Sequence, residues 1–168
     1  YRANVNFNET DLLQSKKRLD KIYRLKKRIE DTQKSSLPDK EFEREIMEAL
    51  TDDLNISKAL SVIDAMIADA NDVLDKNPKD NNLKAIFASN IKLINSILGI
   101  GEQEALKYFQ LGVSEDEKKQ IESLIEERLK ARSEKKFAKA DLIREELAKK
   151  GVSLMDSADG TKWEKIDI

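Results

Sequence analysis

The chain has 168 residues, of which 38% are charged and 5% aromatic, with only 5 glycines and 2 prolines. This balance is typical of a mostly helical protein with wide solvated faces. The chain contains no histidine and no cysteine, which excludes imidazole and thiolate catalysis, as well as zinc bound by nitrogen or sulfur ligands, within these residues.

Charge and hydropathy limit the possible partners. The 31 Lys and Arg residues nearly balance the 33 Asp and Glu residues, which argues weakly against nucleic acid, although a local basic patch would suffice. The sequence has no apolar run of membrane-spanning length and no secretory signal pattern, so we expect a cytoplasmic chain with no membrane partner. It has no Gly-rich phosphate loop and begins with Tyr1. We therefore expect a fragment of a longer protein and not a self-sufficient enzyme.

The first expected helix runs from residue 11 to about residue 31, after an extended start over 1–8, and Asn8 or Thr10 can cap it. One side of this helix is apolar, formed by Leu12, Leu19, Ile22 and Ile29, with Tyr23 and Leu25 flanking. Another side carries cations at helical spacing, namely Lys17, Lys21, Arg24 and Arg28. Such a basic stripe could follow an RNA backbone, and it equally fits an ordinary solvated face.

Three more helices are expected over residues 39–50, 57–74 and 83–98. The first of them should pack through Phe42, Ile46, Met47 and Leu50. Two adjacent acids, Asp52 and Asp53, precede the next helix, where capping and the helix dipole explain them better than a metal or acid–base site. These segments predict an antiparallel helical bundle over 9–101, followed by a linker over 102–113.

A small α+β module is expected over residues 114–168. Ser114 and Glu117 fit a capping box, and the helix that follows has apolar positions at Ile121, Leu124, Ile125 and Leu129. A second helix should present Phe137, Ala140, Ile143 and Leu147 on one face and stop at Gly151. Alternating residues from 152, the tight-turn pair Asp159-Gly160 and a return strand over 161–166 predict a C-terminal β-hairpin.

Six residues of this module combine charge with aromatic rings: Arg132, Phe137, Asp141, Arg144, Asp156 and Trp163. Arginine and aspartate supply directional donors and acceptors for base edges, and an aromatic ring supplies a stacking surface. Single-stranded RNA loops are recognised with this combination. The same residues also fit a plainer interpretation, in which the two rings belong to a small core and the charges form a surface ion pair.

The segment KARSEKKFAKADLIREELAKKGVSLMDSADGTKW closely resembles the C-terminal end of bacterial cysteinyl-tRNA synthetases. The shared pattern is an aromatic followed by Ala-x-Ala-Asp, an Arg three residues on, Gly-x-x-Leu-x-Asp and Gly-Thr-x-Trp. Phe137 stands where that family usually has tryptophan. The stretch TDDLNISKAL and the opening YRANVNFNETDLLQSKKRLDKIY resemble the same family, and Leu54, Ile56 and Ser57 depart from its pattern. The resemblance covers effectively the whole chain.

The resemblance implies a bundle of the class I synthetase anticodon-binding type, belonging to a ligase that charges tRNA with cysteine using ATP in translation. Residues 1–8 would then be a tail from the catalytic domain, which lies outside this chain. The expected partners are tRNA(Cys) and that N-terminal domain. Phe137 would stack on an anticodon base. The other anticodon-binding residues would be Arg132, Asp141, Arg144, Asp156 and Trp163. No catalytic residue, cofactor or metal is expected here, whereas the full-length enzyme uses ATP, magnesium and zinc.

Two alternatives remain. One is a synthetase-like paralogue that joins cysteine to a small amino-sugar acceptor without tRNA, against which Phe137, Asp141 and Arg144 argue, because it would have little use for an anticodon surface. The other is a helical protein-interaction module whose basic stripe meets an acidic partner. The salt dependence of RNA binding distinguishes it from a tRNA binder, because phosphate contacts weaken steeply as salt rises.

Overall fold

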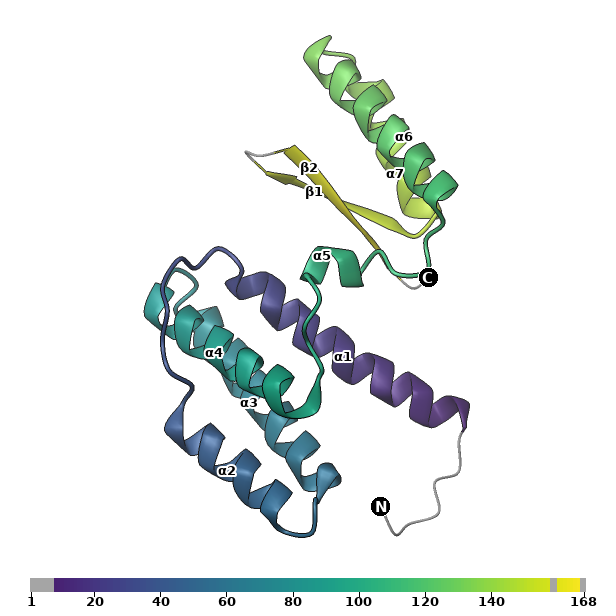
Figure 1. Cartoon of the computed structure of the whole chain (residues 1–168). Helices are drawn as coiled ribbons and strands as arrows, with labels where there is room; N and C mark the ends of the chain where they lie inside the picture. Colours follow the sequence, from purple (N-terminus) through teal and green to yellow (C-terminus); the bar gives the residue numbers. More distant parts are fainter. Residues whose placement is uncertain (1–7, 158–159, 167–168) are drawn as a thin grey trace. The chain divides into compact units, whose positions relative to one another are not determined.

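The computed structural model describes residues 8–157 and 160–166, and the described part contains seven helices and one two-stranded sheet (Figure 1). The chain divides into two compact units between Ala105 and Leu106. The expected extended start over residues 1–7 and Asp159 of the expected turn lie outside the described residues.

The first unit is a bundle of four long helices: α1 (Glu9–Ile29), α2 (Lys40–Thr51), α3 (Ile56–Lys76) and α4 (Asn81–Leu98). Each begins after a short polar side chain that accepts a backbone N–H of the first turn; these caps are Asn8, Asp39, Asn55 and Asp80. At the other end of α4, Gly99 adopts the left-handed conformation with φ 69°, which a residue with a side chain rarely adopts. Consecutive helices run in opposite directions, so the expected antiparallel bundle is confirmed (Figure 1).

The core of the bundle is mainly aliphatic and also contains Phe42 and Phe87. Its fully buried residues include Ile22, Leu25, Ile46, Ile63, Leu74 and Ile94. Four details of the prediction were wrong. Tyr23 and Leu25, expected at the flank, are buried, and Leu12 is 48% exposed, in a part of α1 that is exposed at every residue from Glu9 to Lys17. Met47 is also exposed. The buried side of α2 follows Phe42, Ile46 and Ala49 at i, i+4 and i+7, which leaves the neighbouring position 47 to one side.

The turn between α2 and α3 places Asp52 at the C-cap of α2 and both Asp53 and Leu54 at φ 53°. Only Asn55 caps α3, by accepting from the backbone N–H of Lys58 at 3.0 Å. Two consecutive left-handed residues other than glycine are uncommon. The two acids therefore shape the end of one helix instead of capping the next.

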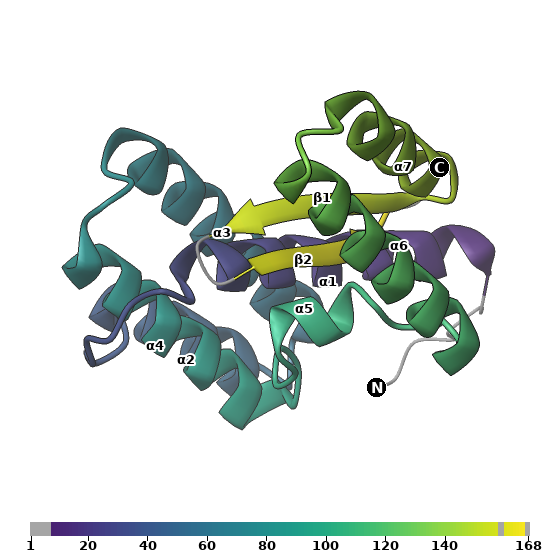
Figure 2. The ribbon, with the colours of Figure 1, turned by 90° about the horizontal axis from the view of Figure 1, so that it is seen from above.

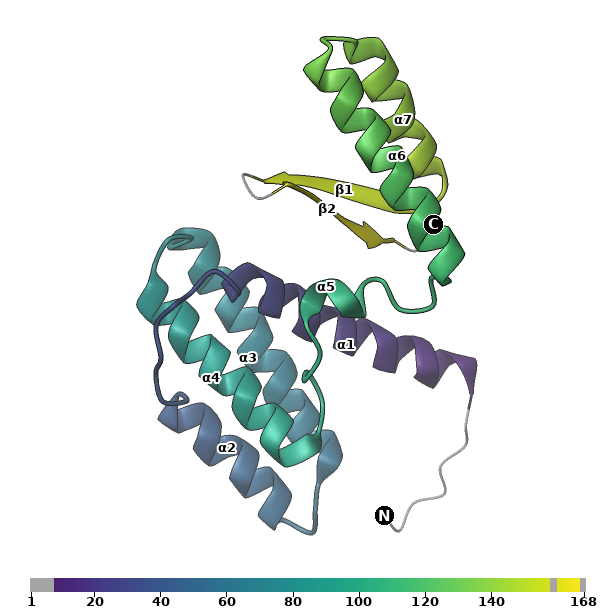
Figure 3. The same cartoon turned by 45° about the horizontal axis from the view of Figure 1, so that its top comes forward.

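The second unit contains helices α6 (Glu115–Ser133) and α7 (Phe137–Lys149) and strands β1 (Val152–Ser157) and β2 (Gly160–Lys165); the short helix α5 (Ala105–Tyr108) lies where the units divide. Ser114 caps α6 by accepting from the N–H of Glu117, as predicted. The strands pair antiparallel, from Val152 opposite Lys165 to Ser157 opposite Gly160 (Figure 2). α6 and α7 lie side by side, and α7 leads directly into the hairpin (Figure 3).

The core of the second unit is small and is formed by Val113, Ile121, Ile125, Ile143, Leu147, Val152 and Trp163. Leu129 is 43% exposed, contrary to the prediction, and Arg128 is buried beside it. Phe137 is also exposed, so the buried side of α7 begins only at Ala140. Part of the expected linker belongs to this unit, since the backbone N–H of Lys165 donates to the carbonyl of Phe109 at 2.9 Å.

Among the described residues, no helix combines the length and the apolar character that crossing a membrane requires.

Candidate nucleic-acid interface

One side of α7 is exposed and carries Phe137, Asp141 and Arg144, spaced at i, i+4 and i+7. This spacing places the three side chains above one another on the same side of a helix. The neighbouring side, with Ala140, Ile143 and Leu147, is buried against the rest of the unit. Core packing therefore fixes the orientation of α7 and leaves a ring, a carboxylate and a guanidinium facing outward. The ring of Phe137 is 61% exposed.

A cluster of charged side chains joins α6 to the hairpin. Arg128 donates from Nη1 and Nη2 to the two carboxylate oxygens of Asp156, at 2.9 and 2.8 Å. Arg132, one turn further along α6, donates from Nη1 to Oδ2 of Asp156 at 2.9 Å. Thr161, which pairs with Asp156 across the strands, donates from its hydroxyl to Oδ1 at 2.7 Å. Three side chains thus hold one carboxylate with four hydrogen bonds.

These contacts fix the charge of the cluster. The hydrogen bonds from Arg128 and then Thr161 hold the pKa of Asp156 far below its ordinary range. The hydrogen bond to Asp156 raises the pKa of Arg128, against the opposing effect of burial, and the nearby charge of Asp141 adds to the increase. Asp156 and Arg128 are therefore both ionised at neutral pH.

The structure brings five of the six candidate residues to the surface of the second unit. Phe137, Asp141 and Arg144 are exposed on α7, and the side chains of Arg132 and Asp156 are 47% and 42% exposed. Trp163 differs, because it is 5% exposed and its ring belongs to the core opposite Leu154. The plainer interpretation thus fits Trp163, whose ring lies in the core, and the exposed ion pair of Arg132 with Asp156, and it does not fit Phe137.

The sequence analysis missed Arg128, which is 5% exposed and completes the cluster. The pattern contained an indication of it. Ile121, Ile125 and Arg128 follow i, i+4 and i+7 on α6, so a cation falls in line with the apolar positions. A buried guanidinium requires a carboxylate partner, and Asp156 is that partner.

The four cations of the basic stripe on α1 differ in their exposure and their contacts. Lys17, Lys21 and Arg24 are exposed. Arg28 instead donates to Oδ1 of Asn71 and to Oδ1 of Asp75 on α3, each at 2.7 Å. Arg28 therefore joins two helices of the bundle, and its assignment to an RNA backbone stays a prediction.

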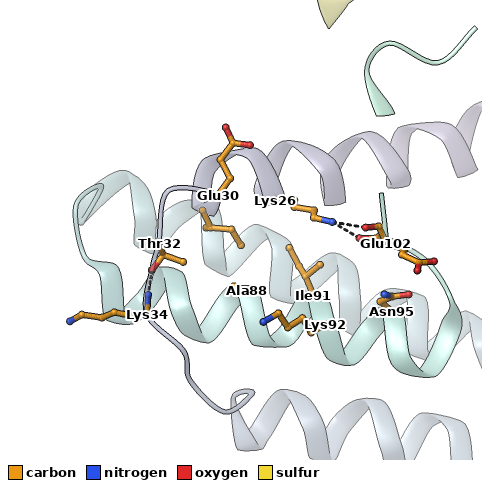
Figure 4. Close-up of a pocket in the computed structure, with 11 residues that line it drawn as sticks. Lys26, Glu30, Thr32, Lys34, Ala88, Ile91, Lys92, Asn95 and Glu102 are labelled. Atoms are coloured by element: carbon orange, nitrogen blue, oxygen red, sulfur yellow. Dashed lines mark hydrogen bonds between the residues drawn. The ribbon is translucent and has the colours of Figure 1, made fainter. Parts of the chain in front are cut away.

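The first unit also contains a cavity of about 390 Å³ between α1, α4 and the segments that follow them (Figure 4). Lys26 and Glu102 lie at its edge, over an apolar floor that includes Ile29, Ala88 and Ile91. Within residues 8–157 and 160–166 there is no group of three or more acidic residues placed to hold a metal ion. The whole chain has neither cysteine nor histidine, so the zinc implied for the full-length enzyme does not fit these residues.

Comparisons with known proteins agree with this geometry. Residues 114–163 match the family model of the cysteinyl-tRNA ligase anticodon binding domain, and residues 45–102 match that of the DALR domain. The chain is 56% identical over 166 residues to a cysteine–tRNA ligase of Nitratiruptor sp., covering 99% of this chain and 36% of that protein. It is 55% identical to one of Aliarcobacter butzleri and 54% identical to one of Helicobacter pylori, covering 99% and 98% of this chain. The chain belongs to the cysteine–tRNA ligase family.

The match to the cysteine–tRNA ligases is partial in length. The chain spans only 35 to 36% of the relatives named above. All six candidate residues, from Arg132 to Trp163, fall inside the segment matched by the anticodon binding domain. The sequence resemblance to this family is therefore confirmed, in both the bundle and the C-terminal module.

Proposed function

We propose that this chain is the tRNA-binding part of a cysteine–tRNA ligase and that its second unit binds the anticodon of tRNA(Cys). The observation that supports this most strongly is the exposed ring of Phe137, on one side of α7 with Asp141 and Arg144. An exposed aromatic residue contributes little to folding, whereas it offers a flat surface to an unstacked base. Its position inside the matched anticodon binding domain supports the same assignment.

Each side chain of the surface has a distinct role in the proposal. Phe137 stacks on a base, which contributes roughly 1–3 kcal/mol per base. Arg132 and Arg144 donate to base edges or phosphates, and Asp141 accepts from a base amino group. In protein–DNA complexes, a two-point contact of this kind favours the correct base over a wrong one by about 1–3 kcal/mol. We expect each such contact with RNA to discriminate to a similar extent. Asp156 holds Arg132, and Trp163 supports the hairpin from within.

In the first unit, the exposed cations of α1 bind phosphates of the RNA backbone; these are Lys17, Lys21 and Arg24. We keep the expected division into a bundle over 9–101 and an anticodon module over 114–168 as part of the proposal. Ligation of cysteine, with the ATP, magnesium and zinc that it uses, belongs to the part of the ligase that this chain does not cover. No step of that chemistry is assigned to residues of this chain.

Fluorescence anisotropy tests the proposal directly. The 168-residue chain is titrated into a labelled cysteine tRNA transcript, and into a transcript that differs only in its anticodon, at two salt concentrations. Tighter, salt-sensitive binding to the native anticodon supports an anticodon reader. Equal affinity for the two transcripts would leave only a surface that holds the backbone. A flat salt profile would instead favour the protein-interaction alternative, because phosphate contacts produce a steep salt dependence.

A further inference from the structure

Arg128 occupies a place in the core of the second unit that an apolar side chain would fill at lower cost. It follows Ile121 and Ile125 on the buried side of α6 and is 5% exposed. Removing the guanidinium of Arg128 from water carries a desolvation penalty, and well-packed apolar residues in place of a buried charged group and its partner are often neutral or stabilising. Stability alone therefore does not explain why Arg128 and Asp156 are paired here.

Asp156 stands where the core meets the surface. Side chains alternate along a strand, so Val152, Leu154 and Asp156 share the face of β1 that packs inward. Val152 and Leu154 belong to the core cluster or pack against it, while the side chain of Asp156 is 42% exposed. Its carboxylate is thus held from inside by Arg128 and meets Arg132 from outside.

The two arginines differ in exposure although they contact the same carboxylate. Arg128 is buried, whereas the side chain of Arg132 is 47% exposed. The hydrogen bond from Arg132 to Asp156 uses one of the five N–H donors of the guanidinium. Two parallel hydrogen bonds from Arg128 fix the plane of the carboxylate, and the carboxylate in turn limits the orientations open to Arg132. The result is a chain of contacts that runs from the core to an exposed cation.

We propose that Arg128 is a positioning residue of the RNA-binding surface, which fixes Asp156 so that Arg132 presents its guanidinium to an RNA base in one orientation. This inference rests on the proposed function. Arg128 itself does not touch RNA. The orientation matters because a guanidinium discriminates best between bases when two of its donors meet two acceptors of one base edge at once.

The test compares variants whose stability is measured together with their affinity for RNA, and the substitutions at positions 128, 161 and 121 leave the net charge unchanged. Arg128→Lys keeps the positive charge and loses the two-donor contact, and Thr161→Val removes another hydrogen bond from Asp156 while keeping the volume of the side chain. Ile121→Val, in the same core but away from the cluster, is the control for lost stability. The fluorescence of Trp163, the single tryptophan, reports unfolding of the second unit. Affinities are measured for the cysteine tRNA transcript and the anticodon-replaced transcript.

We expect Arg128→Lys to lower the preference for the native anticodon about five- to tenfold, within the range of one directional base contact. Thr161→Val should lower it less, and Ile121→Val should leave it unchanged at equal or greater loss of stability. Arg132→Ala should remove the preference to a similar extent, and the Arg128→Lys/Arg132→Ala double variant should lose no more than Arg132→Ala alone. This non-additivity is what a residue acting through Arg132 produces.

Two results would overturn the inference. If Arg128→Lys and Thr161→Val both keep the full preference, or if their effects add to that of Arg132→Ala, Arg128 has only a structural role while the proposed function stands. If the unaltered chain does not distinguish the two transcripts, the proposed function fails and the inference fails with it. Should Arg128→Lys not fold, Thr161→Val and its double variant with Arg132→Ala decide the question.

Discussion

The ammonium group of Lys26 on α1 donates to the carbonyl oxygen of Gly101 at 2.8 Å, just beyond the end of α4 (Figure 4). The same Nζ also donates to the carbonyls of Glu102 at 3.0 Å and Gln103 at 2.5 Å. Burial lowers the pKa of Lys26, and the charges of Glu104 and Glu102 oppose that decrease. One ammonium group thus donates to the backbone carbonyls of three consecutive residues in the segment that follows α4.

This contact predicts that Lys26→Met destabilises the first unit by about 1–2 kcal/mol, because carbonyls that accept from a charged donor lose their partner. Methionine keeps an unbranched side chain, one heavy atom shorter than that of lysine. Denaturant unfolding followed by far-UV circular dichroism measures the loss, with the exposed Lys17→Met as the matched control. An equal effect of the two substitutions would show that the three hydrogen bonds contribute nothing beyond the loss of a surface charge.

Removal of the ring of Phe137 separates binding from folding. We expect Phe137→Ala to weaken binding of the cysteine tRNA transcript by about 1–3 kcal/mol, the contribution of one stacked base. Its effect on unfolding should stay within about 0.5 kcal/mol, because the side chain is mostly exposed. Phe137→Trp should retain or strengthen binding. The comparison variant is Leu142→Ala, equally apolar and 65% exposed on the same helix; a similar loss of affinity there would remove the special role of Phe137.

The cations of α1 should divide into two groups. Lys17→Ala and Lys21→Ala are expected to reduce the slope of log affinity against log salt by about one each and to leave stability unchanged. Arg28→Ala should lower the stability of the bundle, because it breaks the contacts with Asn71 and Asp75. Salt titrations with the tRNA transcript and circular dichroism melts test this division. An unchanged salt slope in both lysine variants would assign them to a solvated face.

The pH dependence of the second unit should depend in part on Asp156. Hydrogen bonds from Arg128 and Thr161 lower its pKa in the folded state, while the unfolded side chain titrates near the ordinary value of about 3.9. The stabilisation is therefore fully present above that value and is lost progressively as the pH falls toward the folded-state pKa. Because the side chain is partly exposed, solvent screening reduces the size of the effect.

Trp163 fluorescence during urea unfolding at pH 7, 5, 4 and 3 measures this dependence. Asp156→Asn should be less stable at pH 7, and the difference between it and the unaltered chain should shrink below pH 4. The comparison is needed because other carboxylates, including those of Glu115 and Glu134, also have lowered pKa values through lysine contacts. A constant difference at all four pH values would exclude titration of Asp156 as its source.

Helix boundaries were predictable because local chemistry decides them. Asn8 and Ser114 cap their helices and Gly99 ends α4, as expected. Asp39, expected as the first residue of its helix, is the N-cap one position before it. The hairpin followed from the alternation of its residues, although Gly160, expected in the turn, is the first residue of β2 and pairs with Ser157. These features depend on neighbours a few residues apart, and a single sequence contains all the information that they need.

The charged contacts were not predictable in the same way. Leu129 belongs to the apolar pattern of α6 as well as Ile125 does, yet Arg128 is buried in its place because Asp156 approaches from a strand 28 residues away. The sequence places Arg28 in the basic stripe of α1 and does not reveal that Asn71 and Asp75 of α3 accept its hydrogen bonds. A charge that pairs across elements has no local pattern, so only the fold reveals its partner.

The order of contacts in the second unit has a kinetic consequence. α6 packs on α7, α7 on β1 and β1 on β2, so each element meets the next one along the chain. Domains built from such short-range contacts close small loops and fold quickly. The Lys165–Glu117 pair at 2.7 Å and the Arg128–Asp156 pair connect the hairpin back to α6 over longer separations. These two ion pairs should form late in folding, after the two strands have paired. Their loss should therefore speed unfolding more than it slows folding.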